Sequence, residues 1–404
     1  MPEMPDRPEM RREEAWRAVE SLRKGLPPTG WVRQFTVGRQ SEIQELRARL
    51  QRAETGALLL HANYGTGKTH MLRYIQEEAL ECGYVVSFVT LDANGAVRFS
   101  QMDQIMGAVV NQLQIPHGPG SCGLADLFDV VSDAIKRDSI SPDHGFWYSA
   151  ALKSRWETSY EFGAYAMFLA LRSWYFTEDP ARKNRIIDWL TQPWQYKTQG
   201  RVLYQELIEK QRDLFREQRS FDQLKQGGVF DFKALGYRHS WDALKDLQRI
   251  AVESGFRGMV LLFDEFESTV TDLRTRKPRQ DAFQNLFDFF GGQKFDGMSF
   301  FAVTPDFVET CKGLLHERRI VDYDYGAFGR LPMFEMSPLE EEDLLGLAER
   351  VVDTHALAYE WKPDGILKSR DFTQQLTDVA RSSSPARTRS FIQRVVELCD
   401  NQVA

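Results

Sequence analysis

Residues 57–69, which read ALLLHANYGTGKT, decide the fold of this chain. The apolar run at 57–60 has the length of a buried strand, and residues 62–69 form a Walker A pattern with alanine in place of its usual first glycine. We expect a helix to follow at 69–80. A strand, a glycine-rich loop and a helix in this order predict a binding site for the phosphates of a nucleotide.

The residue types of this loop suit phosphate binding. Gly65 and Gly67 allow backbone N–H groups to turn toward the phosphates, and the following helix adds the positive end of its dipole. Lys68 is expected to reach the β- and γ-phosphates of ATP, and Thr69 to place its hydroxyl on Mg²⁺. The candidate residues for binding ATP or ADP are Asn63, Tyr64, Gly65, Thr66, Gly67, Lys68, Thr69 and His70.

A second apolar run, MVLLFDE at residues 259–265, ends in two carboxylates and has the form of a Walker B element. Ligands of open α/β sheets bind at the carboxyl ends of the strands. Asp264 is therefore expected to hold Mg²⁺, and Glu265 to polarise the attacking water. A glutamate directly after the aspartate favours hydrolysis over a permanently bound nucleotide. Glu267 is a third acidic candidate, for which a solvated or helix-capping role is the alternative.

Further strands are predicted at 84–91, at 299–303 and within 331–336, and the intervals between strands have helical patterns. This alternation indicates an α/β fold, a P-loop NTPase core with a parallel sheet covered on both faces. A helix is expected near 9–24, and another after Ser41, which is the candidate N-cap. The predicted divisions are an N-terminal helix and linker (1–36), a first core part (37–98), a helical insertion without strands (99–250), a second core part (251–337) and a helical C-terminal region (338–404).

The insertion is rich in aromatic residues. They include Trp147, Trp156, Trp174, Trp189 and Trp194. Two interpretations are open, namely the packed core of a helical subdomain and a surface on which nucleic-acid bases stack. Lysine and arginine are only sparsely interleaved with these aromatics, which favours the packed core.

The overall charge argues against a dedicated nucleic-acid-binding protein, because 58 acidic residues exceed 51 basic residues and give a net charge of −7. One local basic run, LRTRKPR at 273–279, is expected in a loop after the Walker B element. Its cations, which could contact DNA phosphates, are Arg274, Arg276, Lys277 and Arg279. A solvated face or a protein contact is the favoured alternative for such a run.

The four cysteines lie far apart with no CxxC pair, which argues against a structural zinc site or a disulfide framework and fits a reducing compartment. No segment approaches the roughly 20 apolar residues of a membrane-spanning helix, and the N-terminus has no apolar export signal. We therefore expect a cytoplasmic protein.

The segment GRQSEI at residues 38–43 resembles the box that precedes Walker A in AAA+ ATPases of the origin-recognition and STAND-like branch. This resemblance implies that Val37 and Gly38 lie near the adenine. The segment FAVTP at 301–305 is similar to the strand that ends in the sensor 1 residue of that family, which makes Thr304 the candidate to read the γ-phosphate. The alternative is a threonine that only begins a turn.

The C-terminal region resembles the helical lid of the same family, and the resemblance implies a sensor 2 role for Arg387, with Arg389 as the second candidate. AAA+ subunits also insert an arginine finger into the site of a neighbour. Self-association is therefore implied, and the candidates for the finger are Arg318, Arg319 and Arg330.

A narrower resemblance covers most of the chain. RAVESLRKGLP at 17–27, the GRQSEI box, YGTGKTHML at 64–72 and the long helical insertion resemble the P-loop proteins of BREX phage-defence systems, of the BrxC/BrxD kind. The resemblance implies a bacterial defence ATPase encoded beside nucleases, helicases or methyltransferases, any of which could be its partner.

Three functional hypotheses follow. The first is an ATP-hydrolysing module that self-associates and acts on DNA or on a defence partner. The second is a nucleotide-gated switch with little turnover. The third, a small-molecule kinase, is disfavoured by the resemblance of Thr304 and Arg387 to the AAA+ sensors.

Overall fold

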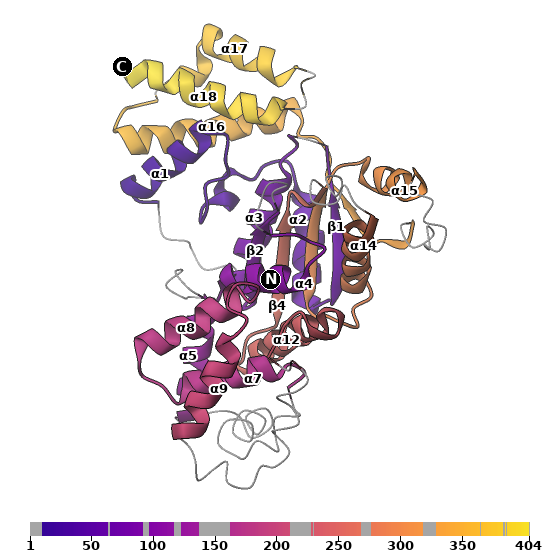
Figure 1. Ribbon diagram of the computed structural model, residues 1–404. Coiled ribbons are helices and arrows are strands. Elements are labelled where there is room, and N and C mark those ends of the chain that lie inside the picture. The colour runs from indigo at the N-terminus through magenta and orange to yellow at the C-terminus, as the bar shows by residue number, and fades with distance from the viewer. Residues whose placement is uncertain are drawn as a thin grey trace. The chain divides into compact units, whose positions relative to one another are not determined.

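The computed structural model describes residues 10–63, 65–91, 97–116, 123–136, 162–210, 228, 230–267, 276–317, 329–363, 365–382, 384 and 386–403 (Figure 1). Its strands form one six-stranded sheet in the order β3-β2-β4-β5-β1-β6. The strands are β1 (Gly56–His61), β2 (Val85–Thr90), β3 (Leu113–Gln114), β4 (Met259–Asp264), β5 (Met298–Val303) and β6 (Met333–Glu335).

The chain divides into two compact units. The loop unit comprises Met1–Ala48, Leu60–Glu77 and Phe334–Ala404, and it contains the Walker A loop. The sheet unit comprises Arg49–Leu59 and Glu78–Met333, and it contains β2, β4 and β5.

The centre of the sheet is parallel, as the sequence predicts. β2 pairs in parallel with β4 from Val85 to Thr90, and β4 pairs in parallel with β5. The N–H of Gly56 donates to the carbonyl of Gly297 at 2.9 Å, so β1 and β5 begin side by side. Every residue of β4 and β5 is buried, which explains their continuous apolar sequences. The fold is therefore an α/β fold with a mostly parallel sheet.

Phenylalanine side chains fill the core of the sheet unit around the end of β4. The rings of Phe263 and Phe301 stack with centroids 4.7 Å apart, and Phe99 meets Phe266 edge to face at the same separation. The helix α14 (Arg276–Phe290) is tied to this cluster, because Asn285 donates to the carbonyl of Phe99 at 2.8 Å. This packing buries Phe266, which directly follows Asp264 and Glu265, in the core of the sheet unit.

The insertion is mainly helical, with α4 (Met102–Asn111), α5 (Gly123–Lys136), α7 (Tyr165–Tyr175), α8 (Pro180–Thr191), α9 (Gln199–Lys210) and α12 (Ala234–Glu253). Trp174 and Trp189 are buried, which confirms the packed-core interpretation for them, whereas Trp147 and Trp156 lie outside the described residues. The prediction that this interval lacks strands is wrong, because β3 pairs antiparallel with β2. A strand of two residues is too short to produce a periodic pattern.

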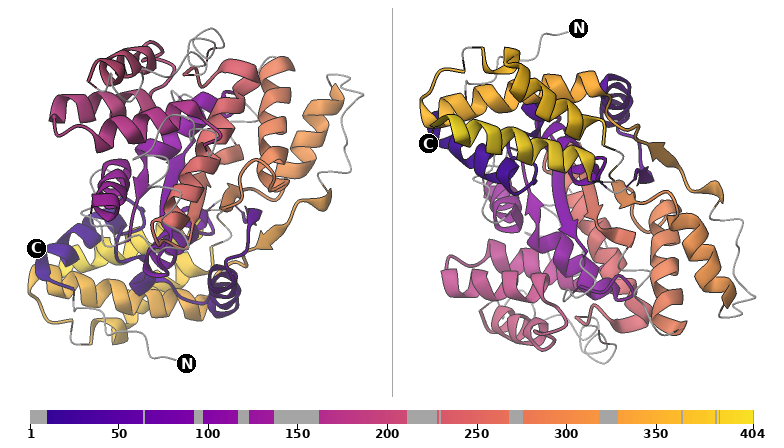
Figure 2. Two further views of the ribbon diagram at one scale, coloured as in Figure 1. Left: turned by 90° about the horizontal axis from the view of Figure 1, so that it is seen from below. Right: turned by 90° about the horizontal axis from the view of Figure 1, so that it is seen from above.

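The loop unit contains α1 (Arg12–Arg23), the C-terminal helices α16 (Glu341–Tyr359), α17 (Arg370–Ala380) and α18 (Arg387–Val403), and most of α2 (Gln40–Arg52) and α3 (Lys68–Glu81). The apolar face of α1 shares one core with α16 and α18, and Figure 2 shows this helix, in indigo, beside the yellow C-terminal helices. Ser41 lies inside the first turn of α2 and is therefore not its N-cap, since the helix already begins at Gln40.

Candidate nucleotide-binding site

The Walker A loop joins β1 to α3 through a tight turn. Gly65 and Gly67 have φ values of +78° and +98°, a region that strongly favours glycine. The hydroxyl of Thr66 donates to the carbonyl of Asn63 at 2.6 Å, and helix α3 starts with a bond from Met71 N–H to the carbonyl of Gly67 at 2.9 Å. The backbone thus has the conformation that the glycines predict, while Tyr64 lies outside the described residues.

Lys68 bends back over its own loop. Its Nζ donates to the carbonyl of Ala62 at 3.2 Å, and Thr69 beside it is partly buried in the first turn of α3. An ammonium group at a helix N-terminus, beside two glycines with positive φ, is a chemical environment that suits phosphate oxygens. The residues present therefore fit the phosphates of a nucleotide.

Arg39 connects the loop to the C-terminal helices within the loop unit. Its guanidinium donates to the carbonyl of Thr66 at 2.8 Å, to the carbonyl of Ser337 at 3.0 Å and to Glu42 at 3.3 Å. The side chain is only 4% exposed, and this burial lowers the pKa of Arg39 while Glu42 opposes the shift. Arg39 belongs to the GRQSEI segment, and the sequence alone indicates no role for it.

Gly38 lies against the first turn of α16. It has a φ of +62°, and an added Cβ would meet the carboxyl carbon of Asp343 at 2.2 Å. That carboxylate accepts a hydrogen bond from the N–H of Glu340 at 2.9 Å and so caps α16. Val37 packs against the core shared by α1 and the C-terminal helices. The segment predicted to border the adenine is thus also the contact surface of α16.

His70 holds the lead-in segment to α3. Its Nε2 lies 2.8 Å from Oγ1 of Thr36, whose hydroxyl is also 2.8 Å from the carbonyl of Val32. Desolvation, together with the nearby Arg39 guanidinium, lowers the pKa of His70 to about 4. The imidazole is therefore neutral at pH 7 and adds no positive charge to the loop.

The acidic pair lies at the carboxyl end of β4 in the sheet unit. Asp264 is 5% exposed, and its Oδ1 accepts from the N–H of Glu265 at 3.1 Å. Its main-chain carbonyl accepts from Leu91 at 3.0 Å, which anchors this end of the strand. Glu265 has an exposed side chain and a φ of +55°, a left-handed conformation that costs a non-glycine residue about 1–2 kcal/mol. Backbone strain of this kind is concentrated at functional sites.

Thr304 follows β5 at the same edge of the sheet as the acidic pair, because β4 and β5 are adjacent and parallel. Its carbonyl accepts from the N–H of Phe307 at 3.1 Å and so begins the turn into α15 (Phe307–Glu317). The backbone at Thr304 therefore begins a turn, as the alternative to a sensor role predicts. The sensor role of the Thr304 hydroxyl stays a prediction. No group of three or more potential metal-ligating side chains occurs among the described residues.

The candidate arginines occupy different surroundings. Arg387 is the first residue of α18, and its guanidinium donates to the carbonyl of Leu339 just before α16. The aliphatic part of Arg389 lies over Gly25 at the end of α1. Arg330 is exposed, whereas Arg318 and Arg319 lie outside the described residues.

The prediction that the basic run lies in a loop is wrong for its second half, because α14 begins at Arg276. Pro278 is compatible with the first turn of a helix, where its missing N–H would have no helical acceptor. Arg279 is only 4% exposed, so its guanidinium cannot contact DNA in this conformation. Lys277 is exposed and pairs with Asp281 at 3.1 Å, and Arg274 lies outside the described residues.

Comparison with known proteins identifies a family for the chain. A family model described as BREX system ATP-binding protein BrxC/D matches residues 10–203 and 233–402, which include the Walker A loop and the acidic pair. No curated protein and no solved structure matches the chain. Within the described part of the chain, no helix has the length and apolar character needed to cross a membrane. Because the family model covers most of the chain and both of its chemical motifs, the chain belongs to the BrxC/D family of BREX system ATP-binding proteins.

Proposed function

We propose that the chain binds ATP with Mg²⁺ at residues 62–69 and hydrolyses it. The backbone of the loop would hold the phosphates, and Lys68 would neutralise the β- and γ-phosphates. Thr69 and Asp264 would be the protein ligands of Mg²⁺, an ion that neutralises phosphate charge during phosphoryl transfer. The strand order supports this assignment, because β1 leads into the loop and belongs to the same sheet as β4.

The observation that carries the proposal of hydrolysis is the pair Asp264 and Glu265. The aspartate is buried at the end of an apolar strand, and the next residue exposes its carboxylate from a strained backbone. A carboxylate at that position can orient the attacking water and accept its proton. Thr304 would help to orient this water, and Arg387 would respond to the γ-phosphate.

The proposed protein class is a cytoplasmic AAA+-type ATPase that couples its nucleotide state to its C-terminal helices. Arg39 supports this coupling, because one guanidinium contacts both the loop carbonyl of Thr66 and the carbonyl of Ser337. Self-association would complete the site with an arginine from a neighbour. Through the C-terminal helices, the nucleotide state would control action on DNA or on a nuclease, helicase or methyltransferase of the same defence system.

The test is the ATPase rate of the purified chain across protein concentration, with and without DNA. The matched variants are Glu265→Gln and Glu309→Gln, since Glu309 is an exposed glutamate on α15 that pairs with Lys312. We expect the first variant to lose at least about a hundredfold in rate, because a general base contributes about 10²- to 10⁴-fold. The second should keep the wild-type rate. Equal rates for the wild type and Glu265→Gln would refute the assigned role.

A nucleotide-gated switch is the second candidate function, and the hydrogen bonds of Arg39 favour it equally, since they connect the loop to the C-terminal helices whether or not turnover occurs. This alternative predicts tight nucleotide retention and a negligible rate that does not depend on protein concentration. Rates that rise with concentration would instead support an oligomeric ATPase.

A further inference from the structure

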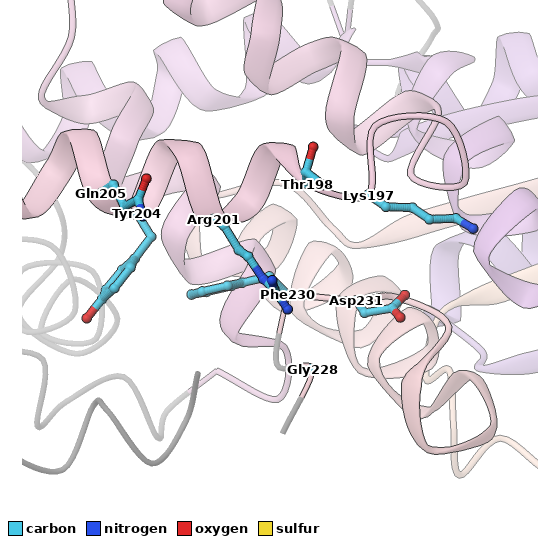
Figure 3. Close-up of a pocket in the computed structure, with 8 residues that line it drawn as sticks. All are labelled: Lys197, Thr198, Arg201, Tyr204, Gln205, Gly228, Phe230 and Asp231. Carbon is cyan, nitrogen blue, oxygen red and sulfur yellow. The ribbon is translucent and has the colours of Figure 1, made fainter. Parts of the chain in front are cut away.

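A cavity of about 490 Å³ opens in the helical insertion, between the start of α9 and the segment that precedes α12 (Figure 3). All of its lining residues belong to the sheet unit, and the cavity has no part in the proposed ATP site. Its volume lies within the range of about 300–1,000 Å³ that is usual for small-molecule sites. The residues that decide its chemistry are Lys197, Arg201, Tyr204, Phe230 and Asp231.

Two aromatic rings give the cavity a rigid apolar wall. Tyr204 and Phe230 have ring centroids 5.6 Å apart and are 5% and 7% exposed, so both are anchored in the core and touch the cavity with only a small part of their surface. Helix α9, which carries Tyr204, packs closely on Phe230 and Trp189, because a Cβ at Gly200 would come within 2.8 Å of both side chains. A flat ring of a ligand could contact the small exposed part of this wall without rearrangement of the helix.

Two cations stand beside this wall. Lys197 and Arg201 are exposed, and neither has an ion pair or a side-chain hydrogen bond within the described part of the chain. The basic residues of the neighbouring helix differ, because Arg182 and Arg185 both pair with Glu206, at 3.2 and 2.8 Å. The cavity therefore combines an apolar wall with two cations that form no ion pair with any side chain that the structure describes.

Asp231 supplies a hydrogen-bond acceptor on another wall. Its Oδ1 already accepts from the N–H of Lys233 at 2.9 Å, and the carboxylate remains exposed. An anion without any donor group would be repelled by this carboxylate, whereas a ligand that also carries hydroxyl or amino groups could donate to it. The lining thus favours a ligand that joins an anionic group, a flat ring and a hydrogen-bond donor.

We propose that this cavity binds one nucleotide unit of a single-stranded nucleic acid, with phosphate on Lys197 and Arg201, the base against Tyr204 and Phe230, and a sugar or base donor on Asp231. Cations beside an aromatic wall are the usual components of sites for single strands. A free nucleotide carries the same chemistry, and the test separates the two sources.

The test uses the full chain and fluorescence anisotropy with labelled single-stranded DNA and RNA 12-mers. The Lys197→Ala/Arg201→Ala variant removes two exposed charges, and the Arg238→Ala/Lys245→Ala variant removes two others from exposed positions on α12 as a matched control. We expect the first variant to weaken binding at least about tenfold and to reduce the slope of log K against log salt by about 0.7, the value for the one phosphate that the variant leaves without a cation. The control should change affinity less than about twofold.

Two further measurements decide the proposal. Photo-crosslinking of a bound oligonucleotide should label Tyr204 or Phe230, which requires no substitution in the core. Competition by AMP, repeated in the Lys68→Ala background, shows whether the cavity takes a free nucleotide; if AMP alone binds there, the nucleotide chemistry is supported and the strand is overturned. Equal binding by the wild type and the Lys197→Ala/Arg201→Ala variant, or no binding of any oligonucleotide or AMP, would overturn the proposal and leave the ATPase assignment untouched.

Discussion

Replacing Arg39 with alanine tests whether this buried guanidinium connects the Walker A loop to the C-terminal helices. The substitution removes donors from the carbonyls of Thr66 and Ser337 and from the carboxylate of Glu42. All three acceptors belong to the loop unit, and the arginine is almost fully buried. The variant should therefore lose stability and nucleotide affinity together.

The expected loss follows from the burial of these partners. A hydrogen bond from a charged donor contributes about 1.5–3 kcal/mol, and removing one partner of a buried ion pair costs about 3–5 kcal/mol. Bonds that share one guanidinium are not additive, so we expect the free energy of unfolding to fall by about 3–5 kcal/mol. The midpoint of thermal unfolding should fall by about 4–6 °C. Since Arg39 also anchors the loop, Kd for ATP should rise at least about tenfold.

Urea unfolding and equilibrium ATP binding measure the two effects. Arg52→Ala is the control on the same helix, because Arg52 is 64% exposed and its pair with Glu54 should contribute less than about 1 kcal/mol. Arg39→Lys should give an intermediate loss, since an ammonium group cannot reproduce the planar fork of donors. If Arg39→Ala changed the free energy of unfolding by less than about 0.5 kcal/mol, the three acceptors would be equally well hydrogen-bonded without the guanidinium. That result would refute the proposed connection between the loop and the C-terminal helices.

Other substitutions test separate features of the site. Glu265→Gly should abolish ATP hydrolysis. In urea its free energy of unfolding should equal that of the wild type or exceed it by up to about 1 kcal/mol, because glycine relieves the backbone strain at φ +55°. Gly38→Ala should destabilise the chain by more than about 2 kcal/mol in the same assay, and adding Asp343→Ala should restore part of the loss by removing the clash. His70 takes up its proton near pH 6.5 when unfolded and near pH 4 when folded, so its contribution is complete above pH 6.5 and is lost as the pH falls through this window. The wild type should lose about 3 kcal/mol more than His70→Gln between pH 7 and pH 4, and equal losses would contradict the lowered pKa.

Local sequence predicted the elements in which a buried apolar strand is followed directly by residues with a recognisable chemical pattern. β1, β4 and β5 are continuous apolar runs because both faces of each are covered, and the Walker A and Walker B residues directly follow two of them. The glycines of the loop indicated its conformation, because only glycine adopts the φ values of Gly65 and Gly67 without strain. The family resemblance also came from these short segments, and the family match confirms it.

Contacts between distant parts of the chain could not be predicted in this way. The packing of α1 on α16 depends on residues more than three hundred positions apart, for example the bond from Arg12 to the carbonyl of Ala358. An amphipathic pattern shows that α1 has an apolar face but does not identify what covers that face. The helical start of α14 was missed for a related reason, since four cations and a proline favour a loop unless the helix is held by core residues such as Phe283 and Phe289.

Gly38, Arg39 and His70 belong to two short motifs, and their contacts fix the geometry of the candidate site without a part in the proposed reaction. Gly38 admits the carboxylate that caps α16, Arg39 bonds to both the loop and Ser337, and His70 bonds to Thr36 in the lead-in segment. A nucleotide that displaced the Thr66 carbonyl would have to stretch or reorient the bond from Arg39, and the same guanidinium would carry that change to the start of α16. Hydrogen exchange in α16 should therefore respond to ATP in the wild type and not in Arg39→Ala, even at ATP concentrations that saturate both.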